Sequence, residues 1–369
     1  MAAVSQHLPR VLYVAQDDLS KNSGYAYRVD RLRRAMENAG AAVTVLGYCS
    51  GAPAIECTCT KSRLFRRLWP LWKGLATPAS GAVISSIGAP YNGIYALLLR
   101  LSGKTVIYDA HDLVQYVLPA TFGKHWAIAT PWIALSERLV GVAAAVTITA
   151  SPTAREFYAK RYGGFVRLMY NIRGNNAPAP LVRRDIRKEF GWQSATIIVY
   201  AGGLQRGVRG IERQFEAVAA ARARGMNVVL LLLGYGERGY FESLGAALLR
   251  EGSLRFIDHV APEMMGGILR QCDVAVSAEP IGYLLPSKYF DYVASGVRVV
   301  AIDDNRDVIR ALGEFVARYD GSTEGLVQYL TQGVERMDVA SVERGRALIR
   351  SLDGMADKIA TEIVENLDG

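Results

Sequence analysis

Charged side chains at the start of one expected helix could bind a phosphate ester. The polar loop Glu279–Pro286 leads into this helix, which Ser287 opens, and Lys288 lies in its first turn. The backbone N–H groups and dipole of a helix N-terminus favour an anion, so a cation there suggests that an anion binds. Asp291 follows one turn later and could accept hydrogen bonds from paired hydroxyls. The segment therefore predicts a nucleotide diphosphate sugar site, and an ordinary capped helix opened by Ser287 is the alternative.

A second cluster of charge lies in a glycine-rich loop. The segment 202–210 reads GGLQRGVRG and stands between an apolar strand, 195–201, and a helix, 211–224. Small residues let the backbone approach a ligand, and guanidinium groups supply fixed positive charge. We therefore expect Arg206 and Arg209 to contact phosphate.

His111 differs in its position from the other three histidines of the chain. It alone combines a place at the carboxyl end of an expected strand, 105–108, with two flanking carboxylates, Asp109 and Asp112. This is where a substrate-contacting imidazole, oriented by a neighbouring acid, would lie in a parallel sheet. A purely structural histidine is the alternative.

The elements that position these residues form two similar series of strands and helices. Buried, β-branched runs alternate with polar loops and with helices that end at glycine, which is typical of Rossmann-like halves. The polar loop expected at 16–24, after the first strand, has no GxGxxG pattern, so a dinucleotide cofactor is not expected. Between the halves, residues 171–180 (NIRGNNAPAP) have the composition of a linker. The expected strands are 10–15, 42–46, 82–87, 105–108, 144–149 and 165–169, then 195–201, 227–233, 254–257, 273–277 and 297–302.

Composition indicates a globular protein of two domains. The chain has 369 residues, of which 50% are hydrophobic and 21% charged. Residues 1–9 lack the pattern of a signal peptide. The apolar stretch Trp126–Ala150 contains Pro131 and two charges, so no membrane span is expected there. Four cysteines without metal-ligand spacing favour a reducing cytoplasm.

Positive charge is concentrated in the first half of the chain. Residues 1–180 hold 20 Lys and Arg against 9 Asp and Glu, a net charge of +11, although the whole chain carries +8. Within this half, Lys61–Gly74 interleaves bulky apolar residues with Arg66, Arg67 and other cations, a pattern typical of an anionic lipid interface. Pro70 is expected to break this segment into two short turns. The alternatives are a core-packed helix with snorkelling arginines and a nucleic-acid surface, which nothing else favours. The residues expected to contact the membrane are Arg66, Arg67, Trp69 and Trp72.

The order of several segments resembles one enzyme group. These are YAGGLQRGVRGIE (200–212), LLLGYGE (231–237), RFIDHVAPEMM (255–265) and PSKYFDYVASGVRVV (286–300), together with the YDAHD segment and the first glycine loop. Together they resemble the GT-B glycosyltransferases, and among them the large retaining group of bacterial mannosyl-, glucosyl- and rhamnosyltransferases. The resemblance covers nearly the whole chain. It implies an α/β fold of two Rossmann-like domains facing across a cleft.

The resemblance also implies how the donor diphosphate is held. Arg209 matches the basic residue of the family that contacts the diphosphate, usually a lysine. The arginine that precedes it in the family falls on Gly203, so Arg206 is the candidate to replace it. The backbone amides of Ser287 and Lys288 would complete the diphosphate site. With His111, we expect Arg209 and Lys288 to be catalytic.

Other matches place the sugar and the nucleoside. The family's ribose-binding Glu falls on Asp291, and its donor-sugar Glu falls on Tyr283, where Glu279 is the nearest carboxylate. This departure bears on the choice of sugar. Gly24 and His111 match the N-domain loop and the histidine near the reacting sugar. The segments that would flank the base and ribose are Gly234–Glu237 and the residues around His259 and Val260.

The expected organisation and function follow. We expect an N-terminal acceptor domain at 1–170, a linker at 171–180, a donor domain at 181–345 and a C-terminal helix at 346–369 that packs back on the first domain. The function expected is metal-independent and cofactor-free transfer of a hexose, with retention, from a UDP, GDP or dTDP sugar. The acceptor expected is a lipid-linked glycan precursor in surface polysaccharide assembly, at the inner face of the plasma membrane. A GT-B epimerase, a non-catalytic GT-B protein that binds a membrane or partner, and a glycosyltransferase acting on nucleic acid are the alternatives.

Overall fold

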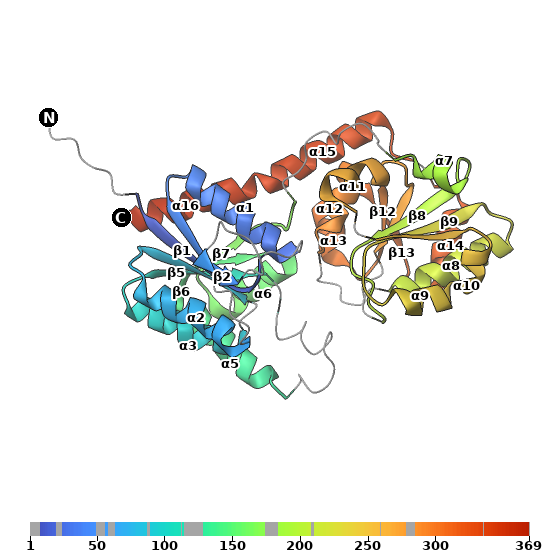
Figure 1. Ribbon diagram of the computed structural model, residues 1–369. Coiled ribbons are helices and arrows are strands. Elements are labelled where there is room, and N and C mark those ends of the chain that lie inside the picture. The colour runs from blue at the N-terminus through green and yellow to red at the C-terminus, as the bar shows by residue number, and fades with distance from the viewer. Residues whose placement is uncertain are drawn as a thin grey trace. The chain divides into compact units, whose positions relative to one another are not determined.

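The chain folds into two compact units. Unit 1 comprises Met1–Arg173 and Leu352–Gly369, and unit 2 comprises Gly174–Ser351. Each unit is a parallel sheet with helices on both faces (Figure 1). The computed structural model describes the chain except for residues 1–7, 20–23, 49–55, 58–62, 87–88, 112, 114–127, 174–183, 208–209, 259, 278–284, 335 and 369.

The sheet of unit 1 has seven strands in the order β3-β2-β1-β4-β5-β6-β7. All of its strand pairs are parallel. The order reverses between β1 and β4, and the crossovers on either side of such a point lead to opposite faces of the sheet. Its strands are β1 (Arg10–Asp18), β2 (Ala42–Tyr48), β3 (Glu56–Cys57), β4 (Gly81–Ser85), β5 (Thr105–Ala110), β6 (Ala144–Thr149) and β7 (Phe165–Leu168).

Helices cover this sheet in two layers. On one face, α1 (Gly24–Asn38) and α16 (Met355–Asp368) bury their apolar sides in a core that includes Leu32, Met36, Ile359 and Ile363. Helix α16 is fixed to α1 through Arg31, which forms ion pairs with Asp353 and Asp357. The other face is covered by α2 (Arg63–Ala76), α3 (Ala89–Leu101), α5 (Thr130–Ala143) and α6 (Pro152–Tyr162).

Helix α2 corrects one expectation. Pro70 was expected to break the segment into two turns, but α2 runs without interruption from Arg63 to Ala76 with Pro70 inside it. A proline removes one backbone hydrogen bond and often kinks a helix, yet packing can hold the helix together. Here Pro70 is buried, and Gly74 lets α2 approach so closely that a Cβ there would meet Val14 and Tyr95.

The sheet of unit 2 has six parallel strands in the order β10-β9-β8-β11-β12-β13. Its order reverses between β8 and β11. The strand β9 is buried at every position, as expected for a parallel strand covered on both faces. The strands are β8 (Thr196–Ala201), β9 (Val228–Leu233), β10 (Leu254–Ile257), β11 (Val274–Ser277), β12 (Arg298–Ile302) and β13 (Val316–Tyr319).

Two helical layers also enclose this second sheet. Phe215, Phe241 and Leu326 pack from one layer into the core of the sheet. That layer contains α8 (Ile211–Ala223), α9 (Arg238–Leu244), α10 (Ala246–Arg250) and α14 (Thr323–Thr331). The opposite layer contains α11 (Pro262–Leu269), α12 (Lys288–Ala294) and α13 (Arg306–Leu312). The remaining helices of unit 2 are α7 (Ile186–Phe190), the 3-10 turn Gly313–Phe315 and most of α15 (Val339–Asp353).

Two expected boundaries were wrong. Strand β1 continues through Asp18, so the polar loop expected from Gln16 begins later. The single C-terminal helix expected over 346–369 is instead the end of α15 and the whole of α16, separated at Gly354. Glycine has the lowest helix propensity after proline, and it stands where the chain passes from unit 2 to unit 1.

Helix α5 carries a buried carboxyl group. Glu137 is 1% exposed, and its Oε1 accepts a hydrogen bond of 2.7 Å from the Tyr158 hydroxyl of α6. Burial raises the pKa of Glu137 from 4.5 to about 7, because the charged form loses its hydration. The folded state therefore binds the proton more tightly than the unfolded state does. The stability that this provides is complete below pH 4.5 and is lost as the pH rises to about 7.

We predict that Glu137→Gln removes this pH dependence. The amide keeps an acceptor for Tyr158 but cannot ionise. Relative to wild type, the free energy of unfolding of the variant should rise by on the order of 2 kcal/mol between acidic and mildly alkaline pH. Urea unfolding at both pH values measures it. Glu365→Gln, at an exposed carboxyl of α16, is the control and should show no such trend; equal trends in both variants would contradict the assignment.

Candidate functional site

The carboxyl edge of the unit 2 sheet is the first candidate site. In open parallel sheets, ligands bind at the carboxyl ends of the strands where the strand order reverses. Here that point lies between β8 and β11. The glycine loop that starts at Gly202 follows β8, and the residues that lead into α12 come after β11. The topology thus brings two of the segments singled out in the sequence to one edge.

Two loop backbones lie against each other at this edge. The Gly202 N–H donates to the Leu233 carbonyl at 2.8 Å, and Leu204 and Gly236 form a parallel bridge. A Cβ on Gly234 would lie 1.9 Å from the Gly202 carbonyl oxygen, so no side chain fits there. Gly234 also has φ +145°, a conformation that L-residues rarely adopt. These glycines bring the backbone after β9 beside the backbone after β8.

Carboxylates fix the shape of the loop after β8. The Arg206 N–H donates to Glu237 Oε2 at 2.7 Å, and the Gly207 N–H donates to Glu212 Oε1 at 2.8 Å. The guanidinium of Arg206 lies over the Tyr240 ring, 4.8 Å from its centroid. Arg206 is therefore held at the start of α9, where its exposed positive charge remains available to a ligand.

Lys288 lies at the same edge. Its side chain is buried, and its Nζ lies 4.0 Å from the centroid of the Tyr200 ring, a cation–π contact. The Tyr200 hydroxyl donates to the Gly203 carbonyl at 3.0 Å, and the Tyr292 hydroxyl accepts from the Ala201 N–H at 2.7 Å. Tyr200 and Tyr292 therefore hold α12 and the glycine loop together, with the ammonium beside the loop.

Helix α12 begins directly after Ser287, where the sequence predicted its start. Ser287 has helical backbone angles and makes no side-chain capping bond, and α12 has only seven residues. Such a short helix adds little dipole, so electrostatic attraction of an anion at this edge comes mainly from Lys288. Asp291 is half-buried in the same helix, one turn after Lys288.

The other predicted donor residues have mixed outcomes. Gly203 is exposed, with nothing near the position of a Cβ, and Val260 is half-buried after β10. Their binding roles stay predictions. Four predicted residues lie outside the part of the chain that the structure describes: Arg209, His259, Glu279 and Tyr283.

His111 marks a second candidate site, at the carboxyl edge of the unit 1 sheet. It follows β5, and its ring meets the ring of Tyr25 edge-on, with centroids 6.2 Å apart. Tyr25 follows Gly24, the first residue of α1, so these predicted residues lie close together. His111 Nε2 lies 2.7 Å from the side-chain amide of Asn171.

A buried ion pair determines how Asn171 faces His111. Arg28 pairs with Asp109 at 2.7 Å, both side chains are fully buried, and Asp109 also accepts from the Tyr13 hydroxyl at 2.6 Å. A guanidinium can only donate, and Arg28 contacts Asn171 Oδ1 at 3.1 Å. The NH2 group of Asn171 therefore points at His111 and donates to Nε2. The imidazole proton of the neutral ring is then on Nδ1.

The oxygens of Asp109 thus face Arg28 and Tyr13. Asp112, the other acid beside His111, lies outside the described residues. The partner observed for Nε2 is an amide, where the sequence suggested a carboxylate.

Sequence reasoning missed several residues that shape these sites. Tyr200 was placed only in a strand, and Asn171 only at the start of the linker. Glu237 was predicted within the segment that flanks the base and ribose, but its bond to the loop after β8 was not. No role was predicted for Arg28. The available signal was positional, since Asn171 lies shortly after the end of the last strand of its sheet. Pairing Arg28 with Asp109 needed the fold, because 81 residues separate them.

The residues expected to contact a membrane lie on α2. Trp72 is 67% exposed, and Trp69 is half-buried. Arg66 and Arg67 belong to α2, but their side chains are outside the described part. Among the described residues, no helix combines the length and apolar character needed to cross a bilayer.

We predict that Gly234→Ala disrupts the paired loops. The added methyl group would meet the Gly202 carbonyl, and alanine disfavours the positive φ, so the free energy of unfolding should fall by about 2 kcal/mol or more. Gly239→Ala is the matched control, because a Cβ there meets nothing within 4 Å. Urea unfolding followed by circular dichroism measures both. Equal stability of the two variants would show that the loops do not pack this closely.

We predict that Asn171 sets the tautomer of His111. In the intact chain at a pH where the ring is neutral, nitrogen-15 NMR of the imidazole should show the proton on Nδ1. Asn171→Ala should return His111 toward the Nε2–H form that free imidazole prefers. Asn366→Ala, at an exposed helix position, is the control. An Nε2–H ring in the wild type would contradict the assignment.

Comparison with known proteins supports the architecture. No family model matches the chain, and no curated protein matches it. Among solved structures, HepE of Anabaena, crystallised with UDP and glucose, aligns with a TM-score of 0.66 at 14% identity, over 97% of this chain and 99% of that one. Sucrose-phosphate synthase of Thermosynechococcus elongatus aligns with a TM-score of 0.64 at 16% identity, over 98% and 96%. WaaG, a glycosyltransferase involved in lipopolysaccharide biosynthesis, aligns with a TM-score of 0.63 at 15% identity, over 95% and 98%.

At these identities the likeness concerns the fold. It extends over both units and nearly the whole length of each chain, and it agrees with two parallel sheets that each carry helices on both faces. The chain has the GT-B fold, that of the glycosyltransferases it resembles.

Proposed function

We propose that this chain is a glycosyltransferase that takes its sugar from a nucleotide diphosphate donor bound on unit 2. The observation that carries the proposal is the position of Lys288. The side chain of this buried residue holds its ammonium over Tyr200, whose hydroxyl bonds the glycine loop after β8, at the point where the strand order reverses. HepE, with the same fold, was crystallised with UDP and UDP-glucose, which makes UDP the first nucleotide to test.

The charges at this edge suit departure of a diphosphate. Breaking a glycosyl–phosphate bond develops positive charge at the anomeric carbon and negative charge on the leaving group. Fixed cations stabilise the leaving group without reorganisation, at about 3 kcal/mol for a well-placed contact. We assign this role to Lys288, with Arg206 and Arg209. Asp291 is assigned to bind the ribose hydroxyls of the donor. No metal is required for this stabilisation.

Unit 1 would supply the acceptor side. Asn171 orients the His111 ring, and we assign to this ring the contact with the reacting sugar. In the mechanism that the GT-B resemblance implies, the acceptor attacks the face from which the diphosphate leaves, and the departing phosphate takes its proton. This gives retention of configuration.

We further propose a lipid-linked glycan precursor as the acceptor, at the inner face of the plasma membrane. The net charge of +11 on residues 1–180 and the exposed Trp72 support a contact with anionic lipid. WaaG, which has this fold, is involved in lipopolysaccharide biosynthesis. A GT-B epimerase would bind the same donor but need no acceptor, so transfer to an added acceptor separates the two.

We predict that a nucleoside diphosphate stabilises the intact chain through Lys288. A thermal-shift screen with UDP, GDP and dTDP should raise the unfolding temperature with one of them. Lys288→Met, which keeps the apolar stem but removes the charge, should weaken that affinity about 100-fold by calorimetry. Asp291→Ala and Arg209→Ala should weaken it as well.

Lys358→Met, on α16 of unit 1, is the matched control and should bind as the wild type does. Stabilisation by none of the three nucleotides would favour a non-catalytic GT-B protein. Wild-type nucleotide affinity in Lys288→Met would contradict a donor site at this edge of the sheet.

A further inference from the structure

Two neighbouring helices of unit 1 expose apolar side chains at helical spacing. On α3 these are Tyr91, Ile94, Leu98 and Leu101, and Leu101 is 84% exposed. Spacings of three and four residues place all four on one side of a helix. A helix that covers a sheet normally directs polar side chains to solvent, so this stripe calls for a partner.

Helix α5 carries a matching stripe. Ile128 precedes the helix and is 83% exposed, and Trp132, Leu135 and Val142 follow at helical spacing. Each of the four is exposed.

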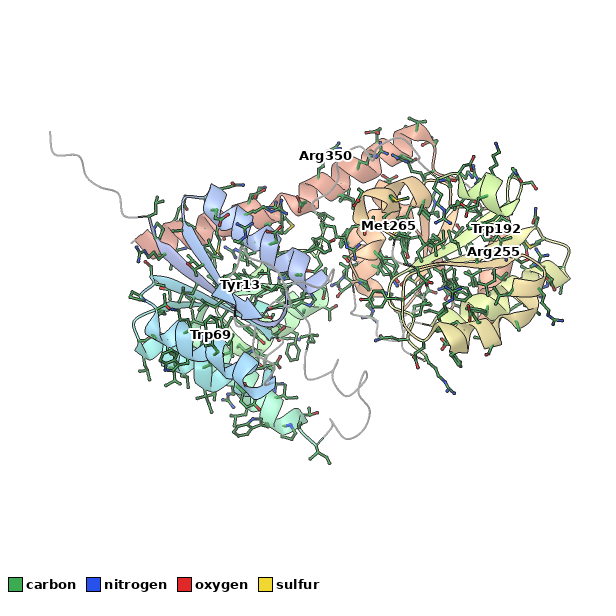
Figure 2. The ribbon with its side chains drawn as sticks, viewed as in Figure 1. Tyr13, Trp69, Trp192, Arg255, Met265 and Arg350 are labelled. Atoms are coloured by element: carbon green, nitrogen blue, oxygen red, sulfur yellow. The ribbon has the colours of Figure 1, made fainter. Side chains whose placement is uncertain are left out.

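The two stripes form one surface. Helices α3 and α5 pack so closely that a Cβ on Gly93 would lie 2.6 Å from the Ser136 carbonyl oxygen. The Gly93 N–H donates to the Ser136 hydroxyl at 2.9 Å. Trp72 extends the exposed apolar side chains onto α2, which packs beside α3. Figure 2 shows α2, with Trp69 labelled, α3 and α5 on the side of the sheet away from α1 and α16.

The charge of this surface is of one sign. Between residues 57 and 136 the sequence contains only two carboxylates, Asp109 and Asp112, against eight Lys and Arg. Asp109 is fully buried, and so is Glu137, the one carboxylate in the sequences of α2, α3 and α5. Arg100 and Arg138 are exposed on α3 and α5.

The opposite face of the same sheet has mixed charge. On α1, Arg33 forms ion pairs with Asp30 and Glu37, and Arg34 also pairs with Asp30. Unit 1 is therefore asymmetric, with one face of balanced charge and one face that is apolar and basic.

We propose that α3 and α5, extended by the exposed part of α2, form a surface that docks on an anionic membrane. This inference deepens the proposed membrane contact and rests on it, but it moves the centre of that contact from the segment 61–74 to the α3–α5 pair. Aliphatic and tryptophan side chains enter the interface between headgroups and acyl chains, and arginines remain at the phosphates. Each cation near an anionic surface adds to the attraction.

Two other partners fit this surface less well. A second copy related by two-fold symmetry would bring the same cations together without carboxylates to pair them. A single-stranded nucleic acid would need aromatic platforms, whereas most of the exposed stripe is aliphatic.

Vesicle binding by the full-length protein tests the proposal. The probes are vesicles of equal parts phosphatidylcholine and phosphatidylglycerol, with vesicles of phosphatidylcholine alone for comparison. The wild type should sediment with the first and bind the second much more weakly. Leu101→Gln with Trp132→Gln should weaken binding to the anionic vesicles at least about tenfold, because two large side chains lose their apolar surroundings. Arg138→Glu should also weaken it.

Matched controls change equally exposed residues elsewhere. Val339→Gln with Leu244→Gln alters exposed apolar side chains of unit 2, and Arg250→Glu reverses an exposed charge there. These variants should bind vesicles as the wild type does. Equal losses in both sets, or no loss in the α3–α5 variants, would overturn the proposal. So would sedimentation velocity that shows a dimer which the α3–α5 variants convert to monomer.

The nucleotide screen keeps this result separate from the proposed function. The α3–α5 variants lie outside the donor site, so they should keep the thermal shift with nucleoside diphosphate. Suppose that the α3–α5 variants lose vesicle binding while neither they nor the wild type shows a nucleotide shift. That result would support the docking surface and contradict the glycosyltransferase. A nucleotide shift in a wild type that binds no vesicles would support the donor site and contradict the docking surface.

Discussion

The close approach of two loop backbones governs the candidate donor site. Gly234 and Gly202 lie so near each other that any side chain on Gly234 would overlap the neighbouring carbonyl. This contact extends the pairing of β8 and β9 past the end of the sheet and fixes the glycine loop next to Lys288. Tyr200 contacts both the loop and the ammonium, so the site depends on backbone geometry as much as on charge.

In unit 1 the corresponding constraint is a buried ion pair. Removing two charges from water is costly unless each finds several partners, and Asp109 receives both Arg28 and Tyr13. The pair also serves the site, because Arg28 orients Asn171 and Asn171 orients His111. The two units therefore use different chemistry at the same place, the carboxyl edge of a parallel sheet.

Much of the architecture could be predicted from the sequence because buried parallel strands are nearly continuous apolar runs. The GT-B fold was confirmed, and β6 and β10 were placed at their observed bounds. Helix α3 escaped notice because its apolar residues surround the helix and leave no polar face. Pro70 misled because local propensity yields to packing. At the sites, candidate residues such as Lys288 and His111 could be selected from the sequence by their chemistry. The contacts Lys288–Tyr200 and Arg28–Asp109 could not be predicted, because they join distant residues that only the fold brings together.

The central claim is that a nucleoside diphosphate binds at the carboxyl edge of the unit 2 sheet. Hydrogen–deuterium exchange of the intact chain, with and without the nucleotide that stabilises it, tests this most directly. The account predicts slower amide exchange in residues 202–207, 234–237 and 285–291, where the two glycine loops and the start of α12 meet. Protection confined to unit 1, or none in these three segments, would contradict it.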